Sequence, residues 1–79
     1  MMRNELEELY EAARQELEDY RTLCATQKAL DPTTSDQVQS ALTSLIARTR
    51  QNYNEHYLLW RYQALMAQAP AEHSLPNLL

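Results

Sequence analysis

The sequence predicts an all-α protein, an antiparallel two-helix hairpin with coiled-coil-like packing. The chain has 79 residues and no glycine, the residue that most tight β-hairpin turns require. Apolar side chains recur at alternating spacings of three and four along two long stretches, as they do on one face of a helix. Between the stretches stands a single helix-breaking segment around Pro32. Two helices joined by one turn therefore account for most of the chain.

The first predicted helix covers residues 2–29. Its residues at heptad-like spacings form an apolar seam: Leu6, Tyr10, Ala13, Leu17, Tyr20 and Cys24. Most of the residues between them are Glu, Arg and Gln, which favour helix at exposed positions. Acidic residues lie in the first turns and Lys28 lies near the end, which complements the helix dipole.

The predicted turn covers residues 30–35. Pro32 disfavours helical geometry at Asp31 and removes a backbone donor, so the first helix ends before it. Asp31 or Thr34 is the expected cap of the next helix. A connection this short forces the two helices to fold back antiparallel.

The second predicted helix covers residues 36–68 and continues the seam from Val38 through Tyr53, Tyr57 and Trp60 to Ala67. In the expected pairing, Tyr10 lies opposite Tyr53. The hairpin as a whole is predicted to form one domain over residues 1–68.

A surplus of apolar side chains near the end of the second helix is the main functional signal. At about 1.5 Å per residue the second helix is roughly 50 Å long and the first roughly 42 Å, so the second is expected to overhang. The overhang would leave Tyr62, Leu65 and Met66 uncovered, and an exposed apolar patch of this kind marks an interaction site. The predicted partner-binding residues are Tyr53, Tyr57, Leu58, Trp60, Tyr62, Leu65 and Met66.

Residues 69–79 are predicted to form a loosely ordered tail. This stretch contains Pro70 and Pro76 and has no helical periodicity. Its leucines, Leu75, Leu78 and Leu79, offer an anchor for a partner, but a frayed terminus is the preferred interpretation.

Composition argues against most other classes of function. The net charge of −4 opposes association with nucleic acid or an anionic membrane, and no apolar run is long enough to span a bilayer. The polar, acidic N-terminus is unlike a signal peptide, and the lone Cys24 fits a reducing cytosol. His56 is interpreted as a packed side chain, and His73 is too far along the chain to form a metal pair with it. We therefore expect no catalysis, no metal and no cofactor.

Three segments resemble a known family. They are Lys28-Ala-Leu-Asp-Pro32 at the turn, the stretch Leu42–Ile46, and the run Tyr57-Leu-Leu-Trp-Arg-Tyr-Gln-Ala-Leu65. Together they are similar to the E-component family of bacterial type III secretion needles, the EscE/SsaE/YscE-like co-chaperones, over most of residues 6–67. The chain departs from the YscE branch in its longer second helix and its tail.

The resemblance implies a bacterial cytoplasmic co-chaperone. Such a protein pairs with a helical-repeat chaperone and keeps the needle subunit, or another secretion substrate, from polymerising prematurely. The sequence leaves two alternatives open. One is a homo-oligomeric helical bundle acting as a small structural or regulatory protein, in which Tyr53, Tyr57 and Trp60 complete a shared core. The other is a subunit of a larger coiled-coil scaffold.

Overall fold

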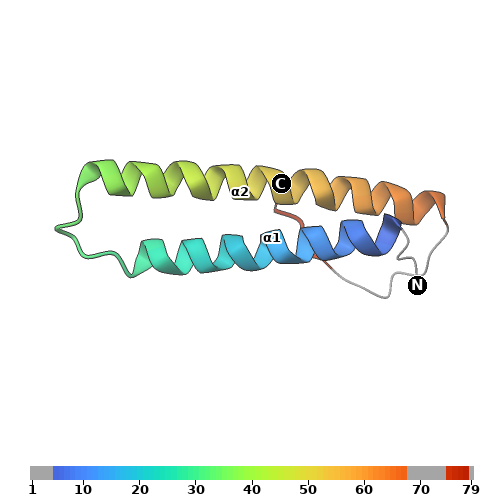
Figure 1. Cartoon of the computed structure of the whole chain (residues 1–79), viewed down its shortest axis with the longest axis horizontal. Coiled ribbons are helices and arrows are strands. Elements are labelled where there is room, and N and C mark those ends of the chain that lie inside the picture. Colours follow the sequence, from blue (N-terminus) through green and yellow to red (C-terminus); the bar gives the residue numbers. More distant parts are fainter. Residues whose placement is uncertain (1–4, 68–74, 79) are drawn as a thin grey trace.

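Two long helices, packed side by side in opposite directions, account for most of the residues that the structure describes (Figure 1). A computed structural model describes residues 5–67 and 75–78. Helix α1 spans Glu5–Lys28 and helix α2 spans Asp36–Met66, and no strand occurs within the described ranges. The predicted all-α antiparallel hairpin with a longer second helix is therefore confirmed. Residues 2–4 and 68 of the expected helices lie outside the described residues.

The turn between the helices is built by side chains that bond to nearby backbone. The Asp31 carboxylate accepts hydrogen bonds from the Thr33 backbone N–H (2.8 Å) and the Thr33 hydroxyl (2.7 Å). These bonds hold the pKa of Asp31 below its ordinary value. The cap of α2 is Ser35, whose hydroxyl accepts from the Val38 N–H at 3.3 Å. The expected caps, Asp31 and Thr34, were wrong, because Asp31 uses its carboxylate to close the turn itself.

The core of the hairpin is small and lies in its middle. Among the described residues four side chains are buried: Ala13 and Leu17 from α1, and Tyr53 and Tyr57 from α2. Tyr53 is the one large side chain of the described residues that is fully buried. Because Ala13 contributes only a methyl group, the tyrosine rings fill the space that it leaves.

The register of the two helices differs from the expected one. Tyr10 was expected opposite Tyr53, but its ring lies 5.9 Å from that of Trp60, seven residues and about two turns further along α2. Near the turn, the Gln27 amide donates to the Thr43 hydroxyl at 3.1 Å. Figure 1 shows α2 extending past α1 at both ends. The overhang of α2 is therefore shared between the two ends of the hairpin. The connection of seven residues between Lys28 and Asp36 is long enough to let α2 shift along α1 from the expected register.

A short segment from the predicted tail lies against the hairpin. Leu75 and Leu78 pack against the buried core, and the Tyr53 hydroxyl donates a hydrogen bond to the Pro76 carbonyl oxygen. The Arg50 Nε donates to the Leu78 carbonyl oxygen at 3.0 Å. We call residues 75–78 the docked segment. The rest of the predicted tail, residues 69–74 and 79, lies outside the described residues.

Candidate partner-binding surface

The strongest candidate site is an exposed apolar face at the C-terminal end of α2. Tyr62, Leu65 and Met66 are 59%, 72% and 68% exposed, as the surplus of apolar residues in this helix predicted. Leu58 belongs to the same face, because spacings of four and three place it in line with Tyr62 and Leu65. This face points away from the buried side of α2. We call Leu58, Leu59, Tyr62, Leu65 and Met66 the outer face.

The other three predicted site residues lie on the opposite side of the helix. Tyr53 and Tyr57 are 0% and 5% exposed, and Trp60 is partly buried against them. Their rings form a continuous strip, with centroids 5.9 Å apart between Tyr53 and Tyr57 and 6.3 Å apart between Tyr57 and Trp60. The seven predicted residues therefore divide between two faces, because only some of the apolar positions find cover within the chain.

Sequence reasoning missed Leu59, which is half exposed on the same side of α2 as Met66. It falls between the expected stripe of Tyr53, Tyr57 and Trp60 and the neighbouring stripe of Leu58, Tyr62 and Leu65, and was therefore assigned to neither. A spacing of seven residues to Met66, two helical turns, was the signal that could have placed it on this face.

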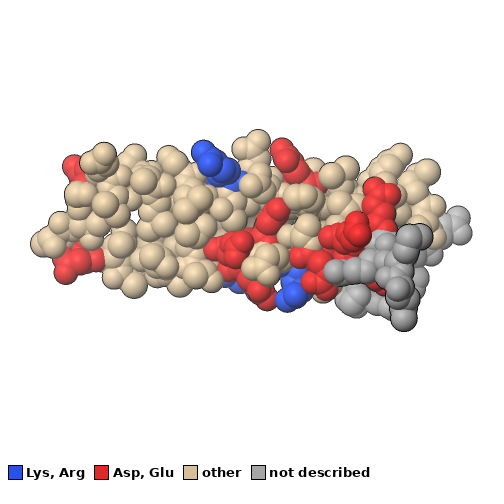
Figure 2. All heavy atoms as spheres, in the orientation of Figure 1, with Lys and Arg blue, Asp and Glu red and all other residues tan. Residues whose placement is uncertain are grey.

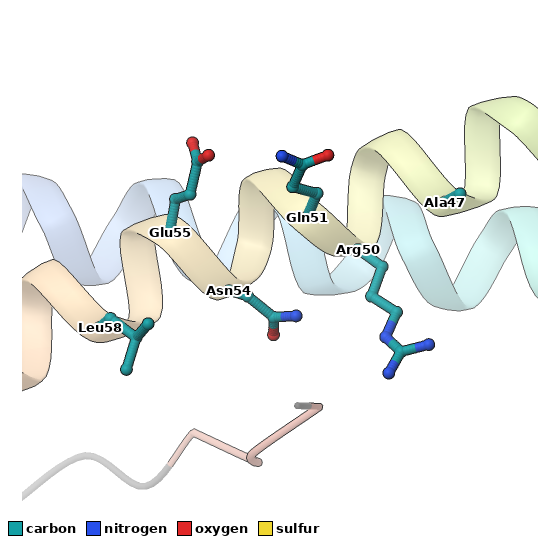
Figure 3. A pocket seen from close by; sticks show the side chains of 6 residues that line it. All are labelled: Ala47, Arg50, Gln51, Asn54, Glu55 and Leu58. Atoms are coloured by element: carbon teal, nitrogen blue, oxygen red, sulfur yellow. The ribbon is translucent and has the colours of Figure 1, made fainter.

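A shallow groove continues the outer face toward the middle of α2. Its volume is about 550 Å³, and its lining residues are Ala47, Arg50, Gln51, Asn54, Glu55 and Leu58. Figure 3 shows Arg50 and Asn54 pointing to the side of α2 along which the docked segment passes. The Asn54 Oδ1 is buried and accepts no hydrogen bond. Leu58 is the residue that joins the groove to the outer face.

Charge is distributed unevenly along the hairpin. Figure 2 shows acidic side chains gathered toward the end that holds the start of α1, with few charges near the turn. Arg14 pairs with Glu11 at 3.0 Å and with Glu18 at 2.9 Å within this acidic region. Arg61 is tied back to the Tyr57 hydroxyl at 3.0 Å, one turn from both Leu58 and Leu65. The outer face is thus apolar with an anchored cation at its edge.

Residues that often carry chemistry serve structural contacts here. The His56 Nδ1 lies 2.8 Å from the Glu16 Oε1 and 3.2 Å from the Asn52 carbonyl oxygen, and it connects the two helices. The Cys24 thiol forms a hydrogen bond with the Tyr20 hydroxyl, which raises the pKa of Tyr20. Among the described residues, no group of three or more His, Cys, Asp or Glu side chains is placed to hold a metal ion.

Neither helix, over its described length, is apolar enough to cross a membrane. No protein-family model, no curated protein and no solved structure matches the chain. The resemblance to the secretion E-components therefore stays a prediction.

Proposed function

We propose that the protein is a non-catalytic, protein-binding co-chaperone of bacterial type III secretion that acts in the cytoplasm. The exposed outer face of α2 is the observation that carries the proposal. Five large apolar side chains lie there together in water, and a contiguous patch of this kind on a small protein marks an interaction site. The resemblance at the turn and along Tyr57–Leu65 supplies the secretion context.

The outer face suits an amphipathic helix as its partner. Leu58, Tyr62 and Leu65 form a straight row, the arrangement by which one helix packs its apolar face against another. Burying one such side chain contributes about 1.5–3 kcal/mol. Several together offset the cost of association, which is about 4–15 kcal/mol. A needle subunit or a helical-repeat chaperone would present helices of this kind.

Protection from polymerisation follows from the same surface. An aggregation-prone subunit offers apolar helix faces, and a hairpin that covers such a face makes it unavailable to a second subunit. The hairpin is itself stabilised by RT ln(1 + [L]/Kd) when it binds. The Arg61 side chain is already held by the Tyr57 hydroxyl. It would therefore lose little further conformational entropy if it made a polar contact with the partner at the rim of the interface.

The test is a pair of double variants on α2. Leu65→Ser with Met66→Ser removes the most exposed part of the outer face. The matched control, Val38→Ser with Leu45→Ser, removes two exposed apolar side chains far from it. Binding to the co-expressed needle subunit and helical-repeat chaperone is measured by co-purification and calorimetry. The outer-face variant should bind at least tenfold more weakly, and the control should bind normally.

Unchanged binding of the outer-face variant would contradict the proposal. Light scattering on the purified chain tests the homo-oligomeric alternative. A tight dimer or tetramer that dissociates when Leu65 and Met66 are replaced would assign the outer face to self-association instead.

A further inference from the structure

The charges of the described hairpin are unbalanced only at the end that carries the outer face. This end consists of residues 5–17 of α1 and residues 54–67, which lie side by side (Figure 1). It holds six carboxylates and two arginines, whereas residues 18–53 hold four acidic and four basic side chains. The excess negative charge is therefore at the same end of the hairpin as the outer face (Figure 2). The six carboxylates are those of Glu5, Glu7, Glu8, Glu11, Glu16 and Glu55.

The two arginines at this end are already engaged within the chain. Arg14 pairs with Glu11 at 3.0 Å and with Glu18 at 2.9 Å. Arg61 donates to the Tyr57 hydroxyl at 3.0 Å. Clustered charge of one sign attracts molecules of the opposite sign. The end of the hairpin that carries the outer face therefore favours a cationic partner.

Glu55 places one of these carboxylates in line with the apolar side chains. It precedes Leu58, Leu59 and Tyr62 by three, four and seven residues, which are the spacings of one helix face. No cation lies three or four residues from it on α2, and its carboxylate forms no ion pair with the residues that the structure describes. An exposed carboxylate in this position is suited to bind a cation of a partner that packs on the leucines.

The groove beside the outer face leaves the Glu55 carboxylate accessible. Glu55 and Leu58 are both among its lining residues. Figure 3 shows Glu55 pointing away from the side of α2 along which the docked segment passes. A helix that lies along the outer face can therefore reach this carboxylate without meeting the docked segment.

A second copy of the chain is a poor match for this arrangement. Two copies that met through the outer face would be related by two-fold symmetry, so the same surface of each would face the other. The two acidic ends would then be brought together, and like charges across an interface oppose association. A basic partner would gain attraction from the same carboxylates, and it would also associate faster at low salt.

We propose that the outer face binds a basic amphipathic helix. The apolar side chains of this helix pack on Leu58, Tyr62 and Leu65, and a lysine or arginine about one turn beyond them pairs with Glu55. The inference rests on the proposed function, because it uses the same surface. It adds the charge that the bound segment carries and the residue that reads this charge.

Two synthetic helices of opposite charge test the proposal on the full chain. The basic peptide carries fluorescein and two copies of the repeat Leu-Lys-Lys-Leu-Leu-Lys-Leu, and the acidic peptide has Glu in place of each Lys. Binding is followed by anisotropy. The basic peptide should bind saturably and at least tenfold more tightly than the acidic one. Its binding should weaken as the NaCl concentration rises, because salt screens exposed charges. Equal binding of the two peptides would overturn the proposal.

A matched pair of charge variants locates the cation. Glu55→Gln removes the carboxylate beside the apolar row and should weaken binding of the basic peptide at least threefold. Asp36→Asn makes the same change in net charge at the turn and should leave binding unaltered. Both side chains are exposed, so both variants should keep the helicity of the unmodified chain by circular dichroism. Equal effects of the two variants would overturn the role of Glu55.

A pair of apolar variants tests whether the peptide lies on the outer face. Leu58→Ser with Tyr62→Ser should weaken binding of the basic peptide at least tenfold, and the control Val38→Ser with Leu45→Ser should bind it normally. Binding that survives Leu58→Ser with Tyr62→Ser would be attraction of charge alone and would overturn the proposal. A chain that dimerises through the outer face and takes no peptide would overturn it as well.

The failure of this inference can be told apart from the failure of the proposed function. Co-purification of the needle subunit and the chaperone can depend on Leu65 and Met66 while the basic peptide fails to bind. In that case the proposed function stands, and only the basic character of the bound helix is refuted.

Discussion

The two sides of α2 carry similar apolar residues, but one side is buried and the other is exposed. The inner side presents Tyr53, Tyr57 and Trp60, and the outer face presents Tyr62, Leu65 and Met66. The inner tyrosines are covered by α1 and by the docked segment, whereas no described residue covers the outer face. Hydrophobic residue type alone therefore does not separate core from surface in a two-helix protein. The separating factor is which side the rest of the chain can reach.

The largest expected effect comes from removing the centre of the inner side. Tyr53→Ala deletes a fully buried ring and should destabilise the fold by about 3–5 kcal/mol. A small domain has only about 5–15 kcal/mol in total, so helicity should be largely lost under mild denaturant. Urea titration followed by circular dichroism measures this. The matched change Tyr62→Ala should stay within about 0.5 kcal/mol of the unmodified chain. Equal destabilisation by Tyr53→Ala and Tyr62→Ala would contradict the difference in burial between the two sides of α2.

Overpacking tests how closely the helices approach in the middle. Ala13 is fully buried, and Ala13→Leu should cost about 1–3 kcal/mol because the tyrosine rings leave no space for it. Ala25→Leu on the exposed side of α1 is the control and should be neutral. Thermal unfolding of both variants gives the comparison. A neutral Ala13→Leu would show that the helices are looser at this point than the structure indicates.

A smaller effect is expected at the polar edge of the helix interface. Glu16→Ala removes the bridge to His56 and should cost about 0.5–1.5 kcal/mol. The value should fall toward the lower end, because the Glu16 Oε2 is buried without a partner and its removal relieves that cost. Glu18→Ala breaks an exposed pair with Arg14 and should cost less than about 0.5 kcal/mol. The urea midpoint of unfolding should therefore fall further in Glu16→Ala than in Glu18→Ala.

The smallest expected effect is a loss of folding stability at alkaline pH. Burial raises the pKa of the Tyr53 hydroxyl above its ordinary value of about 10. The neutral hydroxyl therefore contributes its stability fully below about pH 10, and that contribution is lost as the pH rises through the raised pKa. Tyr53→Phe lacks the hydroxyl, so the stability gap between the two chains should narrow from neutral to strongly alkaline pH. A gap that widens with pH would contradict the burial of this group.

Periodicity in the sequence was sufficient to predict the helices and to identify which residues share a face. A spacing of four placed Tyr53 with Tyr57, and Leu58 with Tyr62, in agreement with the structure. The register was beyond such reasoning, because side chains on antiparallel helices lean toward opposite ends and the seven-residue turn permits several displacements. The misplaced register had little effect on the prediction for Tyr62, Leu65 and Met66, since they face away from α1 in any case.

The docked segment was the larger omission. Two leucines three residues apart carry no helical or strand signal, and a tail with two prolines is typical of disorder. Its place depends on tyrosine rings 18 to 25 residues earlier, a contact that no local pattern reports. The assignment of Tyr53 and Tyr57 to a partner-binding face followed from missing this cover.

The position of the docked segment in the chain sets an order of assembly during synthesis. Helices α1 and α2 are complete before Leu75–Leu78 exist, so the tyrosine strip is made without one of its covers. At about 5–20 residues per second, the ribosome needs roughly 1–4 s to progress from Tyr57 to Leu78. For that interval Tyr53 and Tyr57 exist in the chain without the segment that later covers part of them. The tyrosine strip therefore acquires its last cover only when synthesis has passed Leu78.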